Sequence, residues 1–307
     1  MAQLTTHEVL SQIQAGQSLQ KAELSTINLR ETCLDQGDFA EAYLRQATLA
    51  NASCRETDFS RSTLILADLR SACLQQARLP GAELTQAHLE QADLQQVYAV
   101  GAKFYGAFFD GVNGSNAILD DADLQQVSGP NSRFRHASLI NAVCNQSSFS
   151  QASFEAAVLA RSHWRQAILQ GAAFAAANLE QSDFCEAVLV GANLSEINGL
   201  SANFQQADLT AATLRQAQLD WSDFWNAVLV QADCQQASLF GATLESANLT
   251  RANFADADLR EANLEYAQLD GACFDGCNVR GALFTDATGL TPEQHRWLRR
   301  NGALNVG

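Results

Sequence analysis

The sequence predicts an all-β solenoid, a chain that coils repeatedly so that short parallel strands stack on one another. Two observations lead to this fold class. From Leu19 to Phe284, large apolar residues occupy 50 of the 54 positions that are spaced five apart, without an insertion or deletion. The residue two positions before each of them is usually small, most often alanine, so the repeating unit reads Ala-x-Leu-x-x.

The period of five excludes the common regular elements. On an α-helix, steps of about 100° per residue move successive apolar positions around the axis. On a straight strand, an odd period sends alternate leucines to opposite faces. A chain that bends once per unit, always in the same sense, keeps every leucine inside a coil. Successive coils then pair as parallel strands about 4.8 Å apart.

The repeat resembles the consensus of the pentapeptide-repeat family, Ala-(Asp/Asn)-Leu-x-x, over roughly residues 19–288. The resemblance implies a right-handed quadrilateral parallel β-helix with four pentapeptides in each coil. At four units per coil, the 54 consecutive units give about 13 coils. It also implies that the large residue and the small residue before it point inward, while the other three point outward.

Asp or Asn often stands directly before the large residue. These short polar side chains look like candidate acids, but we expect them to bond to neighbouring backbone groups or to each other across coils. The residues concerned are Asp58, Asp68, Asp93, Asp183, Asn193, Asp208, Asn248, Asn253 and Asn263.

Four units lack a large central residue. In each of them the residue two positions earlier is a bulky aliphatic one, so we expect the two positions to have exchanged volumes. Glycine also permits a positive φ. Three of the four units fall between Val97 and Pro130, which predicts a bent or distorted segment there, either by neutral drift or as a functional kink. The pairs are Val97 with Ala99, Val112 with Gly114, Val127 with Gly129, and Ile197 with Gly199.

The predicted domain organisation is a capping helix in residues 1–17, the β-helix in residues 18–288, and a capping helix and tail in residues 289–307. Thr5 or Thr6 is expected to cap the first helix. In the second helix, Thr291 is the expected N-cap, followed by Pro292 and by Gln294 of a capping box. This helix is expected to cover the last coil. The alternative is a homodimer formed through it, since some members of the family pair through their C-termini.

The amino-acid composition narrows the classes of function that are compatible with the sequence. The 34 acidic and 19 basic residues give a net charge of −15, which repels phosphate backbones and disfavours direct nucleic-acid binding. No targeting segment or membrane-spanning run is evident, and eight dispersed cysteines are typical of the reducing cytoplasm. The histidines lack metal-ligand spacing and no catalytic motif is recognisable. We therefore expect no enzyme activity, cofactor or metal.

The resulting hypothesis is a cytoplasmic scaffold, a rigid rod that binds an unidentified protein partner. The alternative is an acidic mimic of B-DNA, because the family includes quinolone-resistance proteins that bind DNA gyrase. Outward valines and tryptophans suggest a protein-binding face, since tryptophan is enriched in binding hot spots. A preference of β-branched residues for strand-like sides explains the same valines without a partner. The candidate face consists of Ile168, Val188, Val190, Trp221, Trp225, Val228 and Val230.

Overall fold

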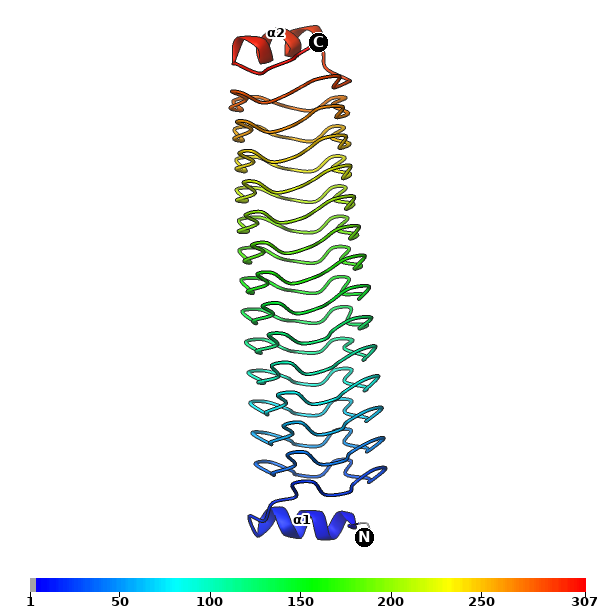
Figure 1. Cartoon of the computed structure of the whole chain (residues 1–307). Helices are drawn as coiled ribbons and strands as arrows, with labels where there is room; N and C mark the ends of the chain where they lie inside the picture. Colours follow the sequence, from blue (N-terminus) through cyan, green and yellow to red (C-terminus); the bar gives the residue numbers. More distant parts are fainter. Residues whose placement is uncertain (1–3) are drawn as a thin grey trace. The chain divides into compact units, whose positions relative to one another are not determined.

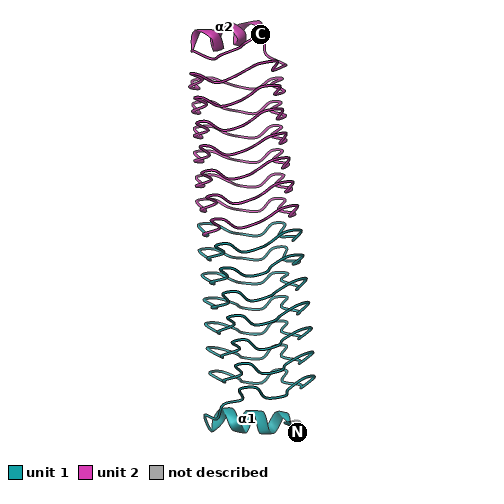
Figure 2. Cartoon of the chain, in the orientation of Figure 1, with its two compact units in different colours: residues 1–157 teal, residues 158–307 magenta. Residues whose placement is uncertain are grey.

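The computed structural model describes residues 4–307 and divides into two compact units, residues 1–157 and 158–307 (Figure 2). Each unit is a stack of coils, with helix α1 (Thr6–Gln14) in the first unit and helix α2 (Pro292–Arg300) in the second (Figure 1). Parallel bridges join residues 20 apart, such as Glu23 with Tyr43 and Ile168 with Val188. Twenty residues are four pentapeptides, so each coil has the four sides that the family resemblance implied.

The sides of each coil are too short for regular strands. Each side contributes a single bridge residue, the one before the large residue. At one such bridge the N–H of Leu24 donates to the carbonyl of Tyr43 at 2.8 Å, and the N–H of Tyr43 donates to the carbonyl of Ala22 at 2.9 Å. The predicted parallel strands are therefore reduced to isolated bridges, because two of every five residues belong to a corner.

Each corner is a tight turn with one residue in the left-handed region. In the first corner the N–H of Ala22 donates to the carbonyl of Leu19, and Lys21 has a φ of 60°. Such a φ costs a non-glycine residue about 1–2 kcal/mol. Glutamine side chains at this position bond across coils, as where Gln76 Nε2 donates to Gln96 Oε1 at 2.7 Å. Amides suit these rows because like charges one coil apart would repel.

The interior follows the predicted register throughout, because every large position from Leu19 to Phe284 is buried. On one side of the second unit, Trp164, Phe184, Phe204 and Phe224 form a continuous ring stack with centroid separations of 6.0, 5.3 and 5.0 Å. Serine is tolerated at the small inward position because its hydroxyl finds an acceptor. The Ser162 hydroxyl, for example, donates to the carbonyl of Leu159 at 2.6 Å.

Two expectations about the irregular units were wrong. Gly114, Gly129 and Gly199 do not have positive φ angles. The segment from Val97 to Pro130 is not distorted either, since its bridges and hydrogen bonds continue in register.

The aromatic ring of the next coil explains the two glycines in the first unit. A Cβ on Gly129 would lie 2.6 Å from Cε1 of Phe149, and a Cβ on Gly114 would lie 2.5 Å from Cε1 of Phe134. In the second unit, a Cβ on Gly199 would lie 2.8 Å from Cδ2 of Leu219. The missing volume is therefore occupied from the coil above as well as by the aliphatic residue two positions earlier.

The Asp and Asn residues before the large position have the structural role that was expected. Their side chains accept the N–H two residues later, which lacks a backbone acceptor in the repeat. Asp58 accepts from Ser60 N at 2.8 Å, and Asn263 accepts from Glu265 N at 2.9 Å. The same bond is made by Asp68, Asp93, Asp183, Asn193, Asp208, Asn248 and Asn253.

The helix caps also match the sequence. Thr5 caps α1 and forms a capping box with Glu8, and Thr291 caps α2 with Gln294. Leu298 of α2 is fully buried. After α2 the chain returns to the last coil, where the N–H of Leu304 donates to the carbonyl of Ala282 at 2.8 Å. The repeat pattern does not predict this pairing of the tail.

Candidate functional site

All seven candidate residues lie in the second unit, where each coil has four sides. We name the sides after the inward residues of one coil: the Leu179, Phe184, Leu189 and Leu194 sides. Residues that differ by 20 stack in a row along one side because the bridges join them. The Leu189 side carries Ile168, Val188, Val190, Val228 and Val230.

The aliphatic residues on the Leu189 side point outward to different extents. Ile168 is 47% exposed and Val188 36%, whereas Val190, Val228 and Val230 are half-buried. Ile168 bridges to Val188, so these two form a contiguous apolar surface. The half-buried valines offer less area to a partner than their outward register suggested.

One coil with polar residues on the Leu189 side separates the two valine pairs. The carboxylate of Asp208 accepts both the N–H of Thr210, at 2.9 Å, and its hydroxyl, at 2.6 Å. Because these groups satisfy one another, covering them with a partner leaves few unpaired polar atoms.

The valines replace a structural hydrogen bond. Val188 and Val228 occupy the position where, in many units, Asp or Asn accepts the N–H two residues later. The N–H groups of Val190 and Val230 accordingly have no acceptor within residues 4–307. Each replacement forgoes a bond worth about 0.5–1.5 kcal/mol. The repeat does not require these valines, so they are candidates for a binding role.

The tryptophans lie on other parts of the surface than the valines, which corrects the expectation of one face. Trp225 belongs to the Phe184 side and is 40% exposed. Trp221 is 56% exposed and stands at the corner between the Leu179 and Phe184 sides, with a φ of 59°. The candidate residues therefore extend over two adjacent sides and the corner beyond them.

The indole of Trp221 is held in place by the next coil. Its ring contacts the ring edge of Phe240 with centroids 5.0 Å apart and planes at 83°. A Cβ on Gly241 would lie 2.5 Å from Cζ3 of Trp221, so only glycine leaves room for the indole there. This exposed aromatic surface is fixed by packing.

Acidic residues collect on the Phe184 side. From residue 182 to residue 266 its pentapeptides contain five carboxylates and no lysine or arginine. Asp223, Glu245 and Glu265 are bonded to neutral side chains, those of Gln205, Asn263 and Thr285. The sequence pattern did not single out these acids, nor Tyr266, which is 54% exposed.

The cysteines are distributed between the core and the surface. Burial raises the pKa of the Cys54, Cys144 and Cys234 thiols, which replace inward leucines. The register places Cys185 on the outside of its coil, but it is only 5% exposed, because a short side chain is covered by the longer residues that stack beside it in its row. All eight cysteines are unpaired in the described structure.

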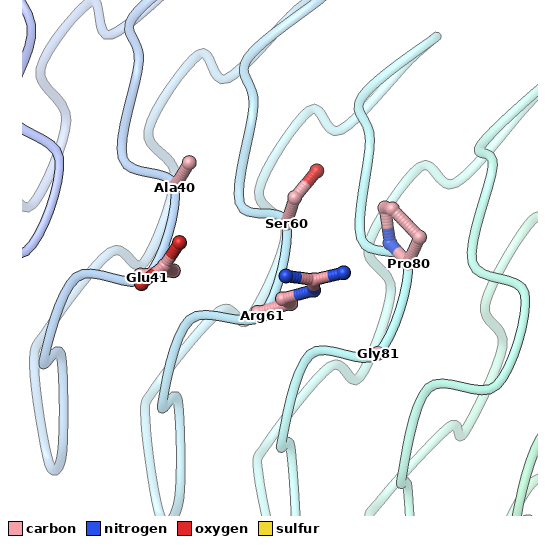
Figure 3. A pocket seen from close by; sticks show the side chains of 6 residues that line it. All are labelled: Ala40, Glu41, Ser60, Arg61, Pro80 and Gly81. Atoms are coloured by element: carbon pink, nitrogen blue, oxygen red, sulfur yellow. The ribbon is translucent and has the colours of Figure 1, made fainter.

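The structure offers little for other kinds of site. Within residues 4–307, no three His, Cys, Asp or Glu side chains are grouped to hold a metal, and no helix is long and apolar enough to cross a membrane. A shallow groove of about 450 Å³ in the first unit lies where small side chains line one row (Figure 3). Its lining consists of Ala40, Glu41, Ser60, Arg61, Pro80 and Gly81.

Comparisons with known proteins give the family. The family model described as Pentapeptide repeats (8 copies) matches in segments that together cover residues 37–286. No curated protein matches the chain.

Several solved pentapeptide-repeat structures are similar. Rfr23 from the cyanobacterium Cyanothece 51142 is 33% identical over 32% of this chain and 63% of its own, with a TM-score of 0.28. HetL from Nostoc sp. strain PCC 7120, involved in heterocyst differentiation regulation, is 26% identical over 92% of this chain and 97% of its own, with a TM-score of 0.23. QnrB1, a plasmid-mediated fluoroquinolone resistance protein, is 20% identical over 65% and 88%, with a TM-score of 0.27. The chain belongs to the pentapeptide-repeat family, whose members form right-handed quadrilateral β-helices.

Proposed function

We propose that this protein is a non-enzymatic cytoplasmic scaffold that binds a protein partner through the second unit. The observation that carries the proposal is the outward row of Ile168, Val188 and Val228, together with Val190 and Val230. Where Asp or Asn would complete the backbone bonding of the repeat, valine instead offers apolar surface to solvent. Buried apolar area is the main favourable term in protein association.

The tryptophans extend this surface. Trp221 and Trp225 present rigid aromatic area, and tryptophan is among the residues that most often dominate binding energies. The packing of Trp221 on Phe240 and Gly241 fixes its indole in advance, which lowers the entropy cost of binding.

We infer that α1 and α2 close the ends of their units. The hydroxyl of Thr6 in α1 donates to the carbonyl of Asn28, and Gln294 Nε2 in α2 donates to the carbonyl of Ala272. A homodimer through α2 is disfavoured, because Arg296, Arg299 and Arg300 are exposed on it and a symmetric contact would oppose them.

A second candidate function is the acidic mimicry of DNA, favoured by the net charge of −15. A mimic should inhibit or protect DNA gyrase in a supercoiling assay, and added salt should abolish the effect. Failure to affect gyrase at any salt concentration would remove gyrase as the target.

The scaffold proposal is tested by capture of partners from host extract. Wild type is compared with Val188→Ser/Val228→Ser and with Trp221→Ala/Trp225→Ala, none of which changes an inward residue. Both variants should melt close to wild type and lose a partner that wild type retains. If melting falls by several degrees and every captured partner remains, these residues serve the fold and the proposal fails.

A further inference from the structure

We propose that the Phe184 side of the second unit binds an extended, arginine- or lysine-rich segment of a partner protein. The residues concerned are Trp225 and Tyr266, the carboxylates Asp223, Glu245 and Glu265, and Trp221 at the leading corner. We call this surface the acidic aromatic face. The inference rests on the proposed scaffold function and adds the chemistry of the partner.

The charge on this face is not balanced by the chain itself. Asp223 accepts from Gln205, Glu245 from Asn263, and Glu265 from Thr285, all of which are neutral donors. Elsewhere on the surface, several carboxylates are paired with arginine, as Asp233 is with Arg215 at 3.2 Å. A cationic segment would supply to the acidic aromatic face the charges that other sides receive from within the chain.

The aromatic rings add a second attraction for the same cations. Guanidinium groups bind over the faces of aromatic rings. The coil geometry already produces this contact, since Arg260 lies over Phe240 and Arg78 over Tyr98, each with 5.4 Å from Cζ to the ring centroid. In both pairs the two residues are one coil apart.

No lysine or arginine stands within two coils of Trp225 in its own row. Its neighbours one coil away are Gln205 and Glu245, and its N–H is bonded to the carboxylate of Asp223 at 2.9 Å. The residue is 40% exposed, with Asp223 two positions before it and Glu245 one coil away in its row. A guanidinium stacked on Trp225 can therefore reach Asp223 or Glu245 at the same time.

The spacing of the face fits an extended segment. Trp225, Glu245 and Glu265 are successive residues of one row, which spans about 10 Å over two coil steps, while three alternate side chains of an extended chain span about 13 Å. Because arginine and lysine side chains are long, successive ones can cover this difference and reach Trp225 and then the carboxylates of Glu245 and Glu265, with Tyr266 at the far corner. Trp221 borders the near corner, with its ring position fixed by Gly241.

The test measures binding of a fluorescent alternating Gly-Arg peptide by anisotropy, with an alternating Gly-Glu peptide as the negative probe. Wild type should bind the Gly-Arg peptide and not the Gly-Glu peptide. Trp225→Ala should weaken binding about ten-fold, and Trp225→Tyr should retain most of it because a ring remains. The isosteric pair Glu245→Gln/Glu265→Gln, which keeps side-chain size, should weaken binding by a similar factor.

A matched control separates this face from net charge. Glu196→Gln/Asp256→Asn removes two charges from the opposite, Leu194 side and should leave the affinity within about two-fold of wild type. Equal weakening by this control, or no effect of Trp225→Ala, would overturn the assignment.

The outcome is distinguishable from failure of the scaffold proposal. If a captured partner depends on Val188 and Val228 but is not displaced by the Gly-Arg peptide, the scaffold function stands and this inference fails. If the peptide binds the acidic aromatic face although no extract partner is captured, this inference stands and the scaffold proposal loses its support.

Discussion

Gly129 and Phe149 should be energetically coupled, because a ring from one coil fills the space that the coil below leaves empty. A Cβ on Gly129 would lie 2.6 Å from Cε1 and 2.8 Å from Cδ1 of Phe149. Carbon atoms in contact are normally about 3.5–4.0 Å apart, so the ring would have to move by about 1 Å. Gly129→Leu should therefore destabilise the protein by about 1–3 kcal/mol or more through overpacking.

The reverse change opens a cavity. Phe149 is fully buried, and Phe149→Ala should cost about 3–5 kcal/mol. The combination Gly129→Leu/Phe149→Ala returns a large residue to the first coil and removes one from the second. Its loss should be smaller than the sum of the single losses by about 1–3 kcal/mol. The free energies come from urea titrations followed by circular dichroism.

A control variant distinguishes the two residues that could fill the space left by Gly129, Phe149 of the next coil and Val127 of the same unit. If Val127 alone filled the missing volume, Gly129→Leu/Val127→Ala would recover the stability lost in Gly129→Leu. We expect no such recovery, because the Phe149 ring still blocks the site. Additive losses in the Phe149 pair, or recovery in the Val127 pair, would refute the explanation by the neighbouring coil.

Three further predictions concern the surface and the thiols. The melting temperature of Val228→Asn should lie within a few degrees of wild type or above it, because the side-chain amide oxygen can accept the N–H of Val230. The same variant should capture less partner. A large fall in the melting temperature would show that valine serves the fold. Native protein should be alkylated first at exposed Cys33. The buried thiols of Cys54, Cys144 and Cys234 should react only on unfolding, because burial raises their pKa. Mass spectrometry of the labelled peptides checks the order, and early labelling of Cys144 would contradict the assigned interior. The hydrogen bond and charge of Arg70 hold the pKa of Asp68 below its usual value, so their stabilisation is present above the ordinary carboxyl pKa and is lost as pH falls through the folded value. Arg70→Gln should therefore destabilise at neutral pH and match wild type in strong acid, as urea midpoints at the two pH values will show; a difference that persists in acid would point to a cause other than this pair.

Much of the fold could be read from the period of the sequence. Because a single register assigns every residue to the inside or the outside, it located the inward Leu69 and Phe174 as well as the structural role of Asp58. The N-cap of α2, Thr291, could also be predicted from the sequence, since capping depends on residues close in the chain.

Contacts between coils were harder to predict. Glycine is needed at position 129 because of the ring of Phe149, which lies 20 residues later in the chain. A rule about the two inward positions of one pentapeptide cannot predict a contact with the next coil. Likewise, Leu304 pairs with the last coil after a helix, where the repeat no longer sets the register.

The candidate site was predicted in part. The outward direction of Val188 and Trp225 followed from the register, but exposure depends on the lengths of stacked neighbours, which left Val190 and Val230 half-buried. The candidate residues do not form one face, because residues close in sequence can lie on different sides: Trp221 stands at the corner before the Phe184 side, and Val228 belongs to the Leu189 side after it. The acids of the Phe184 side are recognised as a group only when residues 20 apart in the sequence are placed in one row.

Hydrogen exchange at the backbone amides of Val190 and Val230 tests the binding role of the second unit most directly. In the free protein these N–H groups lack acceptors within the described residues and should exchange rapidly. In complex with a captured partner, we predict that exchange at both amides slows about ten-fold or more, together with amides around Trp225. Unchanged exchange at these amides, with protection confined to residues 4–157 or to the Leu194 side, would contradict the account.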